Sequence, residues 1–146
     1  ANEVPKSITH LVYLDSQTPN HGDRYRDIMT PDFYKHVVDQ ANERGDGFFA
    51  LGEKGATAIG VNDKQIAKWV NRRLCGHPIS VLEDPIQFDN PKALKIPRTY
   101  IDCSDRRDEV EMVEKGWRYI CVPQGHMALV TAPDEVANAL LEIAGR

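Results

Sequence analysis

Three short segments rich in β-branched and aromatic residues restrict the folds that are open to this chain. They are Ile8–Asp15, Arg98–Cys103 and Trp117–Val122. The first is apolar on both faces, which is typical of a central strand in a parallel sheet. Helical patterns lie between the strands and after the last one, and this order predicts an α/β fold in which helices pack on parallel strands.

The number of predicted strands is small for a complete sheet. A three-stranded parallel sheet has two open edges, and the apolar strand at Ile8–Asp15 would lie near one of them unless further strands covered it. By length alone, 146 residues suffice for one domain. The strand count instead favours half of a domain of roughly 250 to 300 residues, with the preceding strands on other polypeptide.

Composition argues against several classes of partner. The chain has 22 acidic and 18 basic residues, a net charge of -4, and phosphate binding requires clustered Lys and Arg, so no nucleic-acid partner is expected. No apolar run reaches the roughly 20 residues that span a bilayer, so no membrane partner is expected. Cys75, Cys103 and Cys121 lack CxxC spacing and are interpreted as buried thiols, with reactive or bridged thiols as the alternative.

Residues 17–95 contain amphipathic pieces separated by glycine and proline. Thr30-Pro31 predicts the start of a helix, and Gly45 predicts its end. A second helix, which contains Trp69, is predicted from Asn62–Asp63 to Gly76. Between the two helices, Phe48 and Phe49 lie in an apolar segment flanked by glycines, which predicts either a ligand-facing loop or a small satellite core.

His126 is a candidate for acid/base chemistry. It follows the third predicted strand and is preceded by Gly125. Catalytic groups of open α/β sheets gather outside the carboxyl ends of the strands, and imidazole titrates near neutral pH. After it, residues 131–144 predict a terminal helix with Thr131 as its N-cap.

Two carboxylates are placed to orient such a histidine. A histidine base is usually held by a carboxylate that accepts its other ring N–H. Asp15 ends the first strand, and Asp105 lies two residues beyond Cys103. Asp15 would alternatively cap a turn, and Asp105 would alternatively be the N-cap of an acidic helix that ends near Lys115.

A nucleophile is missing from the sequence. No Gly-x-Ser-x-Gly occurs, and Ser7, Ser16, Ser80 and Ser104 lack the glycine-flanked turn that exposes a nucleophilic oxygen. Cys103 is a strand residue and a weak substitute. The remaining histidines and carboxylates show no metal-binding spacing, and no glycine-rich phosphate loop is present, so no metal and no cofactor are expected.

Three stretches of the sequence resemble the C-terminal half of an α/β-hydrolase of the bacterial esterase type. They are Leu11–Ser16, Pro97–Ser104 and, above all, Gly125–Val136. The resemblance implies the last three strands of that fold, a helical cap over about residues 19–95, and the C-terminal helix. It covers nearly the whole chain but only about half of a normal family member.

The resemblance also implies roles for individual residues. His126 matches the general base. Asp15, in the context Tyr13-Leu-Asp15, resembles the acid of members such as haloalkane dehalogenases and is favoured over Asp105, which matches the position used by many other members.

The family's remaining parts would lie elsewhere. The serine and the oxyanion hole would belong to an N-terminal half chain carrying Gly-x-Ser-x-Gly. The substrate would be a small carboxylic ester or lactone, with Phe48, Phe49 and Trp69 lining its pocket. The alternatives are a non-catalytic α/β binding module and a hydrolase-fold enzyme of other chemistry, such as a lyase or dehalogenase.

Overall fold

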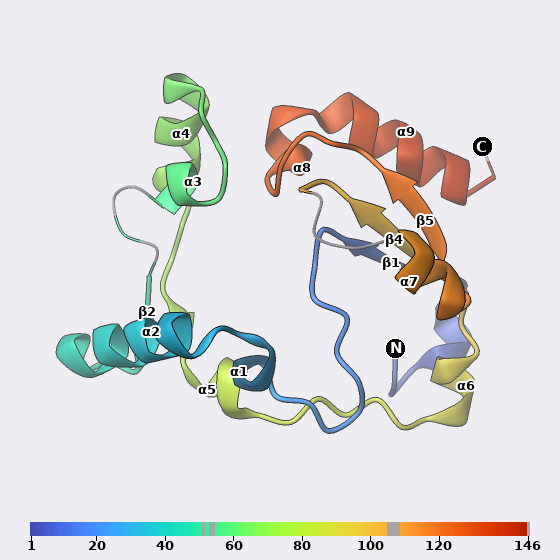
Figure 1. Cartoon of the computed structure of the whole chain (residues 1–146), viewed down its shortest axis with the longest axis horizontal. Coiled ribbons are helices and arrows are strands. Elements are labelled where there is room, and N and C mark those ends of the chain that lie inside the picture. The colour runs from blue at the N-terminus through green and yellow to red at the C-terminus, as the bar shows by residue number, and fades with distance from the viewer. Residues whose placement is uncertain (51, 53–54, 105–108, 146) are drawn as a thin grey trace.

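A parallel sheet forms the centre of the chain, for which the computed structural model describes residues 1–50, 52, 55–104 and 109–145. Its strands run in the order β1 (Leu11–Leu14), β4 (Arg98–Asp102) and β5 (Arg118–Cys121), each parallel to its neighbour. The three predicted strands and the α/β class are therefore confirmed (Figure 1).

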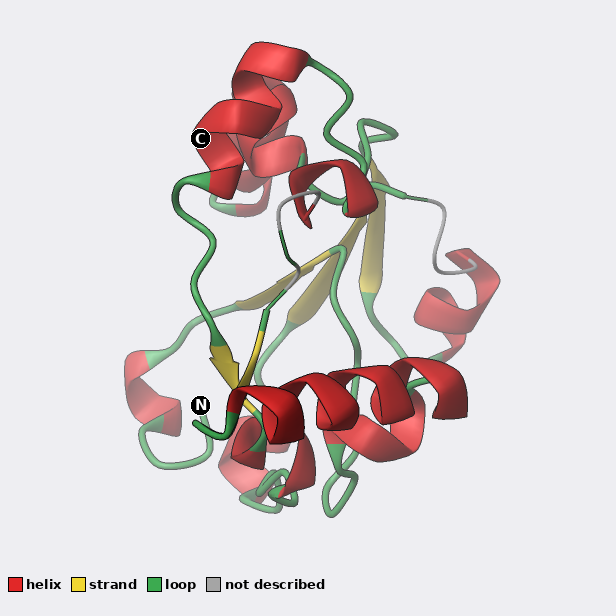
Figure 2. Cartoon of the chain, turned by 90° about the vertical axis from the view of Figure 1, so that its left-hand side faces the viewer, coloured by secondary structure: helices red, strands yellow, loops and turns green. Residues whose placement is uncertain are grey.

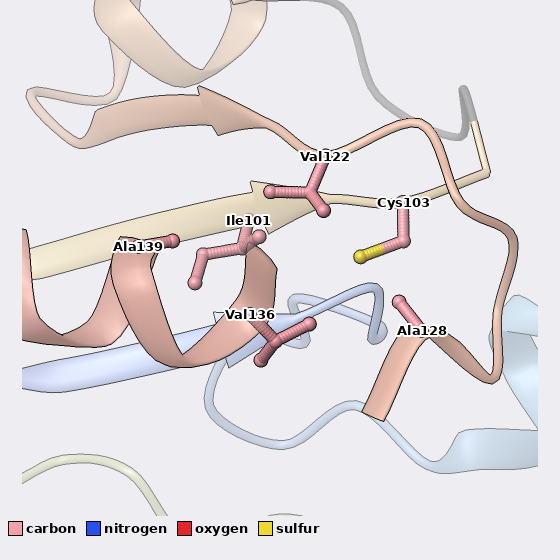
Figure 3. Close-up of a cluster of buried hydrophobic side chains, with 6 residues drawn as sticks. All are labelled: Ile101, Cys103, Val122, Ala128, Val136 and Ala139. Atoms are coloured by element: carbon pink, nitrogen blue, oxygen red, sulfur yellow. The ribbon is translucent and has the colours of Figure 1, made fainter. Parts of the chain in front are cut away.

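An apolar core lies on one face of this sheet, beneath the C-terminal helix α9 (Pro133–Ile143). Val12 and Leu14 of β1 pack against the core, and Tyr13, which alternation places on the opposite face, stacks on Trp117 with ring centroids 4.8 Å apart. Figure 3 shows the buried residues of the core: Ile101, Cys103, Val122, Ala128, Val136 and Ala139.

Short elements make up most of the rest of the chain. Figure 1 places the segment between β1 and β4 mainly on the side toward which the strands' carboxyl ends point, and Figure 2 views the molecule from that side. β2 (Phe48–Phe49) and β3 (His77–Pro78) form an antiparallel pair that the sequence did not predict. The elements outside the sheet and α9 are η1 (Pro5–Ser7), α1 (Tyr25–Ile28), α2 (Pro31–Arg44), β2 (Phe48–Phe49), α3 (Gly55–Ala58), α4 (Lys64–Asn71), β3 (His77–Pro78), α5 (Ser80–Glu83), α6 (Pro91–Leu94), α7 (Glu109–Glu114) and α8 (Ala128–Thr131).

The two helices predicted in this segment begin where capping residues place them. The Thr30 hydroxyl accepts a hydrogen bond from the Phe33 N–H at 3.4 Å, and Gly45 ends α2 with φ 70°. The Asp63 carboxylate accepts hydrogen bonds from the first turn of α4. Because α4 ends at Asn71, it is shorter than the predicted helix to Gly76.

The terminal helix differs from its prediction. The chain forms α8 and then α9, and Ala132, with φ -146°, separates them. Thr131 does not cap α9, because its hydroxyl donates to the carbonyls of Gln124 and Met127, at 3.3 and 3.2 Å. The hydroxyl therefore closes α8 onto the loop that follows β5.

The interpretation of all three cysteines as buried thiols is wrong for two of them. Cys103 is buried in the core, but Cys75 and Cys121 are exposed, and all three are free thiols. Cys121 ends β5, and the next residue, Val122, lies in the core. Because successive side chains of a strand point to opposite faces, the Cys121 side chain lies on the face away from that core. Side-chain alternation therefore decides its exposure.

Two small apolar clusters hold the segment between β1 and β4 together. One contains Val37, Phe49 and Leu82. The other is formed by Ala56, Val61 and Val70, and Met127 and Val130 of the C-terminal region pack against it. The second cluster joins α3 and α4 to the chain that directly follows His126. None of the helices in the described part of the chain has the length and apolar character that crossing a bilayer requires.

Candidate active site

Polar residues gather where the three parallel strands end. Asp15 follows β1, Ser104 lies two residues beyond β4, and His126 lies in the loop after β5. Parallel strands bring their carboxyl ends to one edge of a sheet, so three segments distant in sequence meet there. The Gly125 N–H donates to the Cys103 carbonyl at 2.7 Å and ties the last loop to the end of β4.

His126 and Asp15 form a direct hydrogen bond. The His126 Nδ1 atom lies 2.6 Å from the Asp15 Oδ2 atom. An ionised carboxylate can only accept, so Nδ1 carries the hydrogen of this bond. The Asp15 side chain is fully buried and the His126 side chain is 37% exposed. Nε2 is therefore the ring nitrogen that can exchange a proton with a reacting group.

The backbone of Asp15 has an unusual conformation. Its φ is 44°, and it is the only non-glycine residue with positive φ in the described ranges. Such a conformation costs about 1–3 kcal/mol and is tolerated more readily by Asp than by most residues. The turn aims the carboxylate away from the strand and toward β4 and the His126 loop, and strain of this kind is often found at functional sites.

The ends of β1 and β4 hold the Asp15 carboxylate on several sides. The N–H groups of Cys103 and Ser104 each donate to Oδ1 at 3.0 Å. The Ser104 hydroxyl lies 2.8 Å from Oδ1 and 2.7 Å from Oδ2. A buried carboxylate requires such donors, because its desolvation is otherwise very costly. The site therefore keeps a negative charge next to His126.

Sequence reasoning did not assign Ser104 to this arrangement. The sequence pattern excludes it as a nucleophile, because it lacks a glycine-flanked turn. The signal that could have identified it is its position just beyond the strand next to β1, because neighbouring parallel strands share one functional edge. The alternative acid, Asp105, lies outside the described residues, so the structure brings Asp15 to His126 and leaves Asp105 unplaced.

Cys103 is a poor nucleophile in this setting. Burial raises the pKa of its thiol to about 11, and the nearby carboxylates of Asp15 and Asp102 act in the same direction. The thiolate is the reactive form, so a raised pKa keeps the sulfur inert near neutral pH. Within the described residues, no three His, Cys, Asp or Glu side chains are placed to bind a metal ion together.

The residues predicted to line a substrate pocket lie in different settings. Phe49 is buried against Val37 and Leu82, as in a satellite core. Phe48 is 37% exposed, and Trp69 is 48% exposed with the Arg73 guanidinium 3.9 Å from its ring centre. Contact of these residues with a substrate stays a prediction.

Solved structures of α/β-hydrolases share the fold of this chain. One is an extracellular α/β-hydrolase from a Paenibacillus species, which is described as sharing structural and functional homology with tobacco salicylic acid binding protein 2. It has a TM-score of 0.78 at 18% identity, and the match covers 97% of this chain and 64% of that chain. The methylesterase MES16 from Arabidopsis has a TM-score of 0.65 at 16% identity, with 98% and 63% covered. The resemblance expected from the sequence is therefore confirmed at the level of the fold.

Sequence comparison finds a relative that is named as an esterase. A carbendazim hydrolyzing esterase from Nocardioides sp. (strain SG-4G) is 27% identical over 157 residues, which cover 96% of this chain and 63% of that protein. No protein-family model matches the sequence. The chain thus spans less than two thirds of the length of each of these relatives.

Proposed function

We propose that this chain supplies the general base and the orienting acid of a serine hydrolase that cleaves carboxylic esters or lactones. The observation that carries the proposal is the hydrogen bond between His126 Nδ1 and the buried Asp15 carboxylate. This pair is what a catalytic triad requires besides its nucleophile. The relatives named as esterases support ester cleavage as the reaction.

The reaction follows from the two ring nitrogens of His126. A serine hydroxyl from other polypeptide attacks the acyl carbon while Nε2 takes its proton, and the same nitrogen then protonates the departing alcohol. Water attacks the acyl-serine in the second half of the reaction, again with Nε2 as base. Asp15 holds Nδ1–H throughout and stabilises the imidazolium that forms in each step.

The serine and the oxyanion hole would come from an N-terminal chain that extends the sheet at β1. The Leu11 and Asp15 N–H groups donate to the Pro97 and Ile101 carbonyls of the β4 side, at 2.9 and 2.8 Å. Alternation along the strand then directs the N–H groups of Val12 and Leu14 away from β4. An added strand would pair with that edge, and the interface would resemble a domain core cut in two.

The segment at about residues 19–95 is proposed to form a cap over the reacting groups. Met127, the neighbour of His126, packs against the Ala56, Val61 and Val70 cluster of that segment. A cap anchored beside the base is suited to hold a small acyl or alcohol group, in a pocket to which Phe48, Phe49 and Trp69 would contribute. The names of the relatives, a methylesterase and a carbendazim hydrolyzing esterase, favour a small substrate of this kind.

A serine-directed phosphonate probe tests the proposal. The protein is purified from its natural source, treated with the probe and separated under denaturing conditions, and hydrolysis of p-nitrophenyl acetate is measured in parallel. We expect the label on polypeptide outside these 146 residues and loss of hydrolysis in a His126→Ala variant. An unlabelled, inactive species of 16.5 kDa, or a label within the chain itself, would contradict the proposal.

A further inference from the structure

Ser104 contacts the Asp15 carboxylate through both its backbone and its side chain. The backbone N–H donates to Oδ1 at 3.0 Å, and the hydroxyl oxygen lies 2.8 Å from Oδ1 and 2.7 Å from Oδ2. The proton transfers of the proposed reaction run between His126 and the reacting groups, with Asp15 as the orienting acid, and none of them needs Ser104. Its hydroxyl is therefore available for a different task at the same site.

The donors are divided unevenly between the two carboxylate oxygens. Oδ1 accepts the N–H groups of Cys103 and Ser104, while Oδ2 accepts Nδ1–H of His126. A hydroxyl has one proton to donate, and Oδ2 is the nearer of the two oxygens. Ser104 and His126 then donate to the same oxygen.

We propose that Ser104 is a positioning residue that fixes the Asp15 carboxylate and, by sharing Oδ2 with His126, limits how strongly the protonated imidazole is held. Its catalytic meaning rests on the proposed function. A hydrogen bond to an anion withdraws charge from the acceptor atom, so loss of the hydroxyl would make Oδ2 a stronger partner for His126. The imidazole would then hold its proton to higher pH and act as base less readily.

Two titratable residues, Asp102 and Cys103, directly precede Ser104 in the chain. Asp102 of β4 is 1% exposed, and its Oδ2 accepts the Tyr119 hydroxyl at 3.2 Å. The Asp102 Oδ1 atom lies 3.2 Å from the Ser104 N–H, so Ser104 contacts both buried carboxylates. The Cys103 thiol stays neutral at neutral pH because its pKa is raised to about 11. Asp102 is present in every variant below and does not account for differences between them.

The test is a proton NMR titration of the His126 ring in the protein, which requires no turnover. In Ser104→Ala we expect the titration of the His126 ring to move to higher pH than in the natural protein, because one donor to Oδ2 is lost. Ser104→Thr keeps the hydroxyl and should titrate like the natural protein. The matched control is Ser16→Ala, which removes a hydroxyl next to Asp15 that donates to the Gln17 carbonyl instead.

A second variant keeps the test decisive if Ser104→Ala does not fold. Ser104→Cys preserves the shape of the side chain but donates weakly, so it should shift the pKa of His126 in the same direction. An unchanged titration in a folded Ala or Cys variant would overturn the inference. In the assembled enzyme, the acid limb of the kcat/KM profile should move to higher pH in the same variants. A shift of the NMR titration in a protein that hydrolyses no ester would contradict the proposed function and leave the role of Ser104 supported.

Discussion

Two regions of the chain are stabilised in different ways. One is the edge of the sheet where β1, β4 and β5 end, and the other is the segment between β1 and β4. At the sheet edge, a buried carboxylate in a strained conformation is held by hydrogen bonds that join residues about 90 to 110 positions apart, as from Asp15 to Ser104 and to His126. The segment between the strands relies on small apolar clusters, local caps and surface ion pairs such as Lys35 with Asp39. Exposed ion pairs contribute little to stability. The difference indicates that the sheet edge is held more firmly than the segment between β1 and β4.

The largest expected effect is on turnover at the sheet edge. Asp15→Asn should lower kcat by about 10⁴-fold, because an amide favours the wrong tautomer of the histidine. Steady-state hydrolysis by the assembled enzyme measures the loss, and circular dichroism checks that the variant is folded. Asp105→Asn is the control, and the choice of Asp15 is wrong if Asp105→Asn alone abolishes activity.

A second prediction compares the stability of the two regions directly. Ile101→Ala removes a fully buried side chain from the central strand, and Leu82→Ala removes a buried side chain from the cluster of Val37 and Phe49. Both substitutions leave cavities, which cost about 2–5 kcal/mol in well-packed cores. We expect Ile101→Ala near the upper end of that range and Leu82→Ala near the lower end in urea unfolding. Equal losses would show that the segment between β1 and β4 is packed as firmly as the sheet.

The cysteines provide a third comparison. At pH 8, iodoacetamide should modify the exposed Cys75 and Cys121 at least about 100-fold faster than Cys103, because burial restricts access and the raised pKa suppresses the thiolate. The same raised pKa makes the stability of the fold decrease at alkaline pH. The folded state keeps the Cys103 proton longer than the unfolded state, so this contribution to stability is present below pH 9 and is lost between about pH 9 and 11. Peptide mass mapping of the modified protein decides the first point, and a plateau in stability over that pH range would contradict the second.

The smallest expected effect concerns the junction between the two regions. Met127→Ala removes a side chain that packs against the Ala56, Val61 and Val70 cluster, next to His126. We expect kcat/KM to fall about tenfold, since small displacements of a catalytic group are costly, with a minor loss of stability. Leu129→Ala is the control because that side chain is 59% exposed. Equal activity of the two variants would show that contact with this cluster does not position His126.

Local patterns were sufficient to predict the elements that have strong periodicity or specific caps. Thr30, Asp63 and the β-branched and aromatic residues of β4 acted as expected because their effects operate over a few neighbouring residues. The short β2–β3 ladder was missed because two-residue strands have no usable period. The prediction of Thr131 as an N-cap was wrong because its hydroxyl donates to the Gln124 and Met127 carbonyls instead of accepting an N–H of α9.

The sequence by itself determined the α/β class, the three parallel strands and the position of His126 after the last of them, since these depend on hydrophobic periodicity and chain order. Tertiary structure decided which carboxylate reaches His126, because Asp15 is 111 residues away and meets it only through the pairing of β1 with β4 and β4 with β5. The tertiary structure also brings the Ser104 hydroxyl to the Asp15 carboxylate, whose direction is set by the left-handed backbone conformation of Asp15. No local pattern records such contacts, because they exist only when neighbouring strands end at the same edge.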